Sequence, residues 1–279
     1  MTRHVLELDA TRAEGALPHR EGHNGHPSPM SLAVRACVLE AKYELLKALR
    51  MPAFAIPAIV FPAMFYVLFG VAFGSRGVAG LTMPTYLLAT YGAFGVIGAS
   101  LFAFGVGVAV ERGHGWLTLK RATPMPPASF LLAKLAMCAL FSVAIVALLA
   151  TLGVTLGGVR LAAPTWTLLM CTLVAGAVPF CALGLALGLL VAPSAAAPIA
   201  NLVYLPMAFA SGLWIPLEAL PAVVRSIAPW LPAYHLAQLA LKTIGGGADA
   251  PVWSHVAALL GFALAGLGVA LYAYRRQEE

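Results

Sequence analysis

Six long apolar stretches dominate the chain and limit what it can fold into. They cover residues 52–74, 84–110, 128–156, 164–192, 196–215 and 251–274. Each reaches or exceeds the ~20 residues that a helix rising ~1.5 Å per residue needs to cross ~30 Å of hydrocarbon. Because 61% of the residues are hydrophobic and 10% are charged, a water-soluble core could not hold this much apolar surface. The sequence therefore predicts an all-α membrane protein with six transmembrane helices.

The basic residues predict the orientation of these helices. Six crossings place both termini on one side, and the 17 Lys and Arg residues divide unequally between the two sides. The side of the termini would hold Arg3, Arg12, Arg20, Arg35, Lys42, Lys47, Arg50, Arg112, Lys120, Arg121, Lys134, Arg275 and Arg276. The other side would hold Arg76, Arg160, Arg225 and Lys242. By the positive-inside rule both termini are cytoplasmic. The net charge of +6 is thus an orientation signal, and no nucleic-acid partner is expected.

The segment before the first span has two parts. Residues 1–30 are polar and rich in His, Pro and Gly, which predicts a disordered cytoplasmic tail. His19, His23 and His26 could offer imidazoles to a metal on a helix, but the interleaved prolines and glycines oppose that helix, so no metal site is predicted. Residues 31–50 predict an amphipathic helix along the membrane surface.

The connections between spans differ in character. Residues 216–250 carry four prolines among apolar residues, which predicts short helices dipping into the outer leaflet and capping a pathway. Trp230 and Tyr234 would join an interfacial aromatic belt. Residues 275–279 form a short cytoplasmic C-terminus. The four cysteines are interpreted as small apolar residues, without a disulfide framework.

The sequence shows no feature that would supply energy for uphill transport. The middles of all six spans lack Asp, Glu, Lys, Arg and His, so coupling to an ion gradient is not expected. The sequence also lacks a Gly-x-x-x-x-Gly-Lys-Ser/Thr phosphate loop. Uphill transport would need a separate subunit, and residues 111–127 offer it a contact, with an amphipathic turn from Trp116 to Arg121 between glycines and prolines. An ordinary basic loop that only orients the protein is the alternative.

Two motifs in this order resemble one family. The first is Glu111-Arg112-Gly113, followed by Leu117, Leu119, Lys120, Arg121, Thr123-Pro124 and Lys134. The second runs from Tyr204-Leu205-Pro206-Met207 through Ser211-Gly212-Leu213-Trp214-Ile215-Pro216 and Leu220-Pro221 to Trp230-Leu231-Pro232-Ala233-Tyr234-His235. Over residues 31–274 the chain resembles the ABC-2 type permeases, the membrane subunits of ATP-binding-cassette exporters.

The resemblance implies a half-transporter in the bacterial inner membrane. Residues 31–50 would be a connector helix, 51–274 the six-helix transmembrane domain, about 112–122 a coupling helix and about 216–235 re-entrant helices. Two copies, or two related permeases, would join two copies of a cytoplasmic ATPase that binds ATP and Mg, while this chain itself needs no cofactor. Glu111 and Arg112 would form an ion pair at the hinge. The implied ATPase-coupling residues are Glu111, Arg112, Trp116, Leu117, Leu119, Lys120 and Arg121.

The resemblance also implies a substrate pathway at a dimer interface. Its candidate residues are Tyr91, Phe94, Ser100, Phe102, Asn201, Tyr204, Met207 and Ser211. Simple helix packing is the alternative for each, and Asn201 is favoured because an amide in hydrocarbon needs a partner. The lining predicts a hydrophobic, amphipathic or lipid-linked cargo. The implied external cap comprises Pro216, Pro221, Trp230, Pro232, Tyr234 and His235.

Two other functions stay open at this point. Ser211 and His255 both fall near external ends of spans and could serve an intramembrane serine hydrolase if their side chains met within ~3 Å. A passive channel or assembly factor would need no ATPase. Gly184 and Gly188 predict a close helix approach in the fourth span, which is a structural feature.

Overall fold

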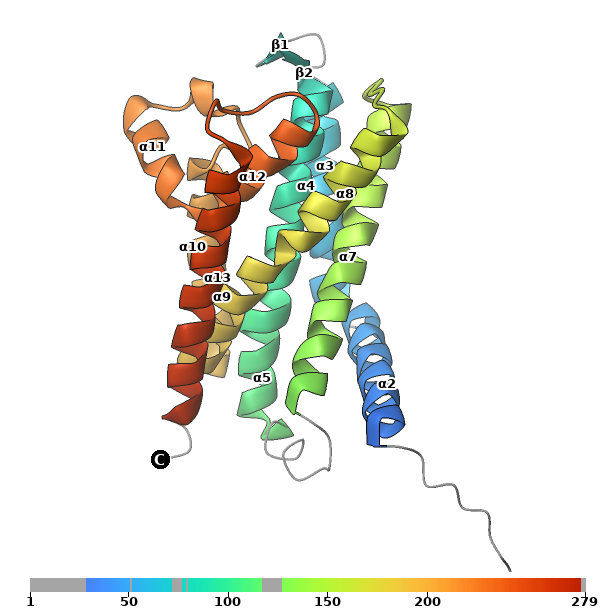
Figure 1. Cartoon of the computed structure of the whole chain (residues 1–279), viewed down its shortest axis with the longest axis vertical. Helices are drawn as coiled ribbons and strands as arrows, with labels where there is room; N and C mark the ends of the chain where they lie inside the picture. Colours follow the sequence, from blue (N-terminus) through green and yellow to red (C-terminus); the bar gives the residue numbers. More distant parts are fainter. Residues whose placement is uncertain (1–28, 51, 72–76, 79, 117–126, 277–279) are drawn as a thin grey trace, which may run out of the picture.

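The computed structural model describes residues 29–50, 52–71, 77–78, 80–116 and 127–276, which form a bundle of long helices (Figure 1). The long helices are α2 (Pro29–Arg50), α3 (Pro52–Phe65), α4 (Met83–Leu101), α5 (Gly107–Gly113), α7 (Pro127–Thr155), α8 (Ala163–Ala175), α9 (Ala177–Leu190), α10 (Pro193–Ala210) and α13 (Val252–Arg275). Two π-helical segments, η1 (Tyr66–Val71) and η2 (Phe102–Val106), continue α3 and α4. The remaining elements are β1 (Gly77–Val78), β2 (Leu81–Thr82), η3 (Leu217–Ala219), α11 (Ala222–Ile227), η4 (Ala228–Trp230) and α12 (Pro232–Thr243).

Each predicted span overlaps one helix or consecutive helical segments, although residues 211–215 of the fifth span are not helical. Four are long and apolar enough to cross a membrane, namely Met83–Gly113, Leu131–Thr155, Ala163–Leu190 and Val252–Arg275. The other two predicted spans correspond to α3 with η1, and to α10. α10 has 18 residues and includes Pro198, Pro206 and Asn201, which lower its mean hydropathy. The helical fold is confirmed, and the count of six crossings stays a prediction.

Proline and glycine set several boundaries. α8 ends at Ala175 because the ring of Pro179, four residues later, clashes with a carbonyl in a continuous helix. The chain therefore bends at Gly176 within the fourth predicted span. α10 ends at Ala210, before Gly212, whose φ of 76° favours glycine.

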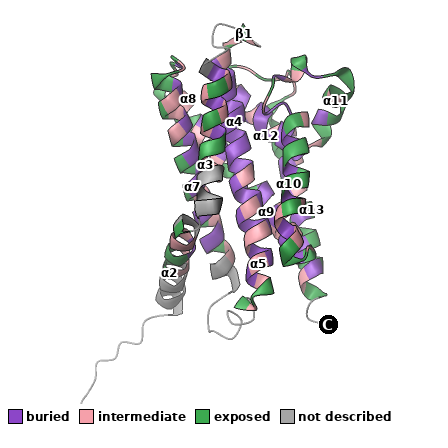
Figure 2. Ribbon diagram, turned by 180° about the vertical axis from the view of Figure 1, so that it is seen from behind, coloured by how far each residue is buried: buried purple, intermediate pink, exposed green. Residues whose placement is uncertain are grey.

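α4 lies at the centre of the bundle. Of its 19 residues, 17 are buried, and its neighbours are α3, α7, α8, α9, α10 and α12. Figure 2 shows the same pattern, with buried residues along α4 and exposed ones on the outer helix faces. Many exposed residues on α13 are apolar, including Leu260, Leu264 and Leu271. Such an outer surface suits lipid.

The predicted close approach at Gly184 and Gly188 is confirmed. A Cβ at Gly188 would lie 2.6 Å from the carbonyl oxygen of Gly105 in η2. α9 therefore packs backbone to backbone against the π-helical segment.

The two ends of the bundle carry different elements. The end of α5, the start of α7, the C-terminus and α2 lie toward one end in Figure 1, and α11, α12 and the β1–β2 hairpin lie toward the other. The antiparallel hairpin, with Gly77 opposite Thr82, is a departure from the predicted all-α fold. The predicted tail at 1–30 falls almost entirely outside the described residues.

Candidate functional site

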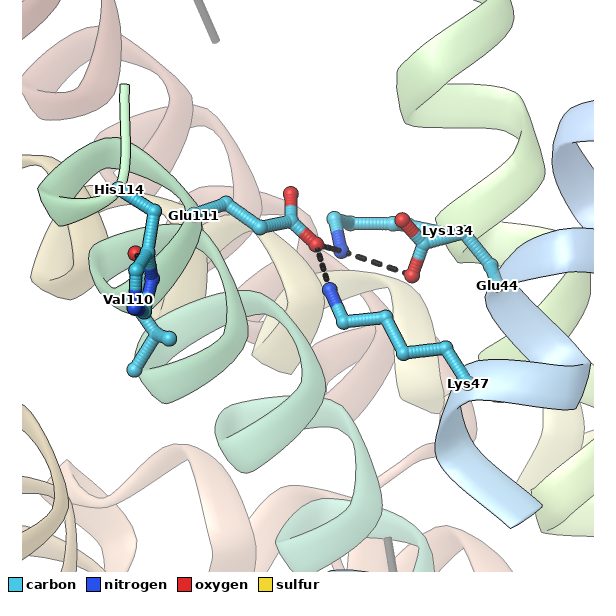
Figure 3. A network of polar contacts seen from close by, with 6 residues as sticks. All are labelled: Glu44, Lys47, Val110, Glu111, His114 and Lys134. Atoms are coloured by element: carbon cyan, nitrogen blue, oxygen red, sulfur yellow. Dashed lines mark hydrogen bonds and ion pairs between the residues drawn. The ribbon is translucent and has the colours of Figure 1, made fainter. Parts of the chain in front are cut away.

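Four charged side chains meet at the base of the loop that follows α5 (Figure 3). Lys134 of α7 donates hydrogen bonds to Glu111 Oε1 at 2.9 Å and to Glu44 Oε2 of α2 at 3.1 Å. Lys47 of α2 also donates to Glu111 Oε1. We call Glu44, Lys47, Glu111 and Lys134 the charge network. It joins α2, α5 and α7.

The pairing within the charge network matters strongly for stability because some of its side chains are buried. The side chains of Glu111 and Lys134 are 0% and 1% exposed, whereas that of Lys47 is 33% exposed. Removing such charges from water costs several kcal/mol per ion, which only close, hydrogen-bonded pairing offsets. Two carboxylates and two ammonium groups balance formally. Each member therefore depends on the others to stay charged and buried.

Arg112 and Glu111 do not form the predicted ion pair with each other. Consecutive residues on a helix point in different directions, so their side chains do not meet. Arg112 instead donates to the carbonyl oxygens of Leu189 and Val191 at the end of α9, the second at 2.5 Å. Gly113 has a third partner, because a Cβ at this position would lie 2.6 Å from the Pro193 ring. The three consecutive residues Glu111, Arg112 and Gly113 thus contact different parts of the bundle.

The proposed ATPase-coupling segment is only partly described. α5 ends at Gly113, and Trp116 is 44% exposed with Lys47 Nζ 5.0 Å from its ring centroid. This cation–π contact links the start of the loop to α2. Leu117, Leu119, Lys120 and Arg121, and with them most of the predicted coupling helix at 112–122, lie outside the described residues.

A groove of about 290 Å³ collects half of the candidate pathway residues. Its lining comprises Ala58, Phe61, Pro62, Phe94, Gly95, Gly98, Ala99, Phe102, Asn201, Tyr204 and Leu205. α3 and α10 form the walls, and α4 with the start of η2 forms the floor. Asn201 Nδ2 donates to Ala197 O at 3.2 Å, and its amide oxygen has no hydrogen-bond partner among the described residues.

The groove is held by aromatic contacts between α4 and α10. The Tyr204 hydroxyl donates to Phe94 O at 2.7 Å, and the Phe94 and Tyr204 rings stack at 4.9 Å between centroids. Phe102 meets the Tyr204 ring edge to face at 6.1 Å. A Cβ at Gly98 would lie 2.7 Å from the Tyr204 hydroxyl. Glycine at this position lets Tyr204 reach the backbone of α4.

The other candidate pathway residues lie outside the groove lining. Tyr91 and Ser100 are fully buried because α4 is surrounded, and the Ser100 hydroxyl bonds to Val96 O at 2.8 Å within its own helix. The Tyr91 hydroxyl donates to Trp214 O at 3.3 Å. Met207 and Ser211 are buried at the other end of α10.

The candidate cap residues lie in two environments. Trp230 is 80% exposed and Pro221 is exposed, whereas Pro216 and Pro232 are buried. Tyr234 is only 8% exposed and packs against the His255 ring at 5.9 Å, so it does not join an exposed aromatic belt. The short helices are present, and α12 extends the region to Thr243, beyond the predicted limit at residue 235.

His235 and His255 form a pair that sequence reasoning missed. Their Nδ1 atoms are 2.9 Å apart, and His235 Nε2 lies 3.0 Å from Pro229 O. Since a carbonyl only accepts, Nε2 of His235 carries the proton, and His255 then donates from its Nδ1. Burial lowers the pKa of His235, partly opposed by the hydrogen bond to Pro229.

The same pair bears on the hydrolase hypothesis. Ser211 Oγ and His255 Nε2 are both buried without a hydrogen-bond partner among the described residues. They therefore do not form the nucleophile and base pair that serine hydrolysis requires.

Sequence reasoning also missed Glu44 and Lys47 as site residues. Their partners Glu111 and Lys134 stand in the first motif, but the spacings of 64 and 90 residues leave no local pattern. The charged residues of the amphipathic helix over 31–50 were the available signal, but the sequence does not show which of them are buried.

Comparison with known proteins agrees with this arrangement of apolar helices and a charged end. The family model of the ABC-2 type transporter matches residues 35–244, which include the charge network and the groove. The chain is also 28% identical over 235 residues to the "Putative transport permease YvfS" of Bacillus subtilis (strain 168), covering 84% of this chain and 95% of that protein. With the family match spanning most of its length, this multi-pass membrane protein belongs to the ABC-2 type transporter family.

Proposed function

We propose that this chain is the permease subunit of an ATP-driven exporter and that a separate cytoplasmic ATPase moves it through the loop between α5 and α7. The buried charge network carries the proposal. Because it ties the base of the loop to α2 and α7, a push on the loop reaches three helices together. A free basic loop would instead bend locally and leave the bundle at rest.

The groove supports the choice of cargo. Its lining is apolar and aromatic, with the Asn201 amide and the Tyr204 hydroxyl as polar side chains. A hydrophobic, amphipathic or lipid-linked molecule fits such walls, whereas a small ion would lose its hydration without compensation. Substrate would move along this groove.

Two copies of the chain, or two related permeases, would enclose the pathway. Phe61 and Leu202 are 50% and 72% exposed on the helices that form the groove walls. A partner covering them would close the groove from the lipid. Two ATPase subunits that bind ATP and Mg would then shift both permeases between two access states. ATP biases this equilibrium because the complex binds it with different affinity in the two states.

The proposed orientation puts both termini in the cytoplasm of the bacterial inner membrane. The bias in Lys and Arg supports it, as does the position of α2, the end of α5 and the C-terminus toward one end of the bundle (Figure 1). The cap built from α11 and α12 would then face outward.

Gentle extraction of the tagged chain from its native host tests the proposal. A cytoplasmic ATPase should copurify, and Trp116→Ala and Lys120→Glu should weaken its association or uncouple hydrolysis from transport. Trp253→Ala is the matched control, because Trp253 is 71% exposed near the opposite end. A chain that emerges alone, or normal coupling in both loop variants, would contradict the proposal. Labelling of a cysteine at position 114 should require access from the cytoplasm.

A further inference from the structure

The Arg112 side chain binds the end of α9 and the first residue of the joint that leads to α10. The last carbonyls of a helix lack partners within the helix, and a positive charge near them is favourable. The Arg112 guanidinium donates to two such oxygens, those of Leu189 and Val191. Leu190 is the last residue of α9 and Pro193 is the first of α10. The fork geometry of the guanidinium therefore fixes the α9 side of a two-residue joint.

The next residue makes a second contact across the same joint. A Cβ at Gly113 would meet Pro193 Cγ at 2.6 Å and Cβ at 3.0 Å. The end of α5 thus lies directly against the first residue of α10. Of two consecutive residues at the base of the loop, Arg112 therefore holds the end of α9, and Gly113 contacts the start of the helix that forms one groove wall.

α5 continues α4 through η2 and also contacts α10. The π-helical segment η2 stands between α5 and α4, and such segments are single wide turns that interrupt the regular α-helical bonding. α10 is a single helix from Pro193 to Ala210. Asn201 and Tyr204 lie about 12 and 16 Å along it from Pro193. A displacement of its first turn reaches them through Pro198, which removes one backbone hydrogen bond but does not interrupt the helix.

We infer that Arg112 and Gly113 form a mechanical link that makes α10 follow the loop between α5 and α7, so that movement of the loop displaces the groove wall bearing Asn201 and Tyr204. The link rests on the proposed function, in which an ATPase pushes this loop. Arg112 acts through the α9–α10 joint and is a positioning residue.

Hydrogen exchange on the full chain in nanodiscs tests the link without any ATPase. Arg112→Gln should speed exchange of the amides of residues 195–197, 199 and 200 by about five-fold or more, the factor expected for the loss of one net hydrogen bond. Arg112→Lys should recover part of the protection, because an ammonium group reaches one carbonyl at a time. Gly113→Ala should disturb the same amides by displacing Pro193. The control is Arg276→Gln, whose guanidinium lies over Tyr272 at 4.8 Å, away from the joint. Unchanged exchange in Arg112→Gln would overturn the link.

A second measurement uses the chain with its copurified ATPase. Spin labels on Leu202→Cys in α10 and Leu264→Cys in α13, both exposed, report the distance between the helices after the native cysteines are replaced. ATP should change this distance, and Arg112→Gln should remove at least half of the change. A wild-type change in an Arg112→Gln complex that still hydrolyses ATP would refute the link. Failure of the wild-type chain to bind an ATPase would refute the proposed function, while the exchange result would still decide whether the joint is held.

Discussion

Replacing Lys134 with Met should be one of the most destabilising single changes in the chain. Lys134 is 1% exposed, and its ammonium group pairs with Glu111 at 2.9 Å and Glu44 at 3.1 Å. Met fills similar volume but removes the ammonium group that both buried carboxylates share. Breaking a buried pair in this way costs about 3 to 5 kcal/mol. The folding equilibrium constant should therefore fall by roughly two to three and a half decades.

Reversible unfolding in mixed micelles measures this loss. Lys42→Met is the matched control, because Lys42 is exposed on α2 and its loss should change the free energy of unfolding by about 0.5 kcal/mol or less. Adding Glu111→Gln to Lys134→Met removes the charge of one of the two carboxylates that lost the ammonium group, so the double variant should be more stable than the sum of the single effects predicts. A loss below about 1 kcal/mol for Lys134→Met, or strict additivity in the double variant, would refute the reasoning.

Three further outcomes follow from the packing and the external histidines. Gly188→Ala should lower the free energy of unfolding by about 1 to 3 kcal/mol, because its Cβ would meet a backbone oxygen, whereas Gly261→Ala, with no atom within 4 Å, should raise it by about 0.5 to 1 kcal/mol. Tyr204→Phe should cost about 0.5 to 1.5 kcal/mol through the lost bond to Phe94 O, with Tyr272→Phe unchanged because Tyr272 is exposed; melting curves that coincide would contradict this. The folded-state pKa of His235 lies below its unfolded value of 6.5, so the unfolded chain binds more protons, and stability should fall as pH drops below about 6.5. Melting temperatures at pH 7.5 and 5.5 should differ less in His235→Gln than in the wild type, and an equal difference would contradict the assignment.

Most helix positions could be predicted because prolines punctuate the apolar stretches. Pro52, Pro193 and Pro232 each stand at the first position of a helix, where a missing N–H costs nothing. The π-helical segments could not be predicted in the same way. η2 packs against Gly184 and Gly188 of α9, a contact between segments about 80 residues apart in the sequence, and no local pattern marks it.

The pathway prediction was limited by what a sequence says about helix neighbours. Phe94, Phe102, Asn201 and Tyr204 do lie together, because aromatic side chains on two packed helices stack. Tyr91 lies on the same helix but is fully buried in the bundle, and hydropathy cannot separate an apolar residue facing lipid from one facing another helix.

A buried Glu111 is compatible with spans whose middles carry no charge, because the helix that bears it is longer than one membrane crossing. The apolar helix from Met83 to Gly113 has 31 residues, more than the ~20 that cross the hydrocarbon. Glu111 lies about 42 Å along the helix from Met83, so if Met83 stands at one membrane boundary, Glu111 lies about 12 Å beyond the other. Protein, and not lipid, then excludes water from the charge network. Phe102 stands nine residues earlier, about 14 Å from Glu111, near the inner boundary. One helix can therefore hold charges outside the membrane and line an apolar groove within it.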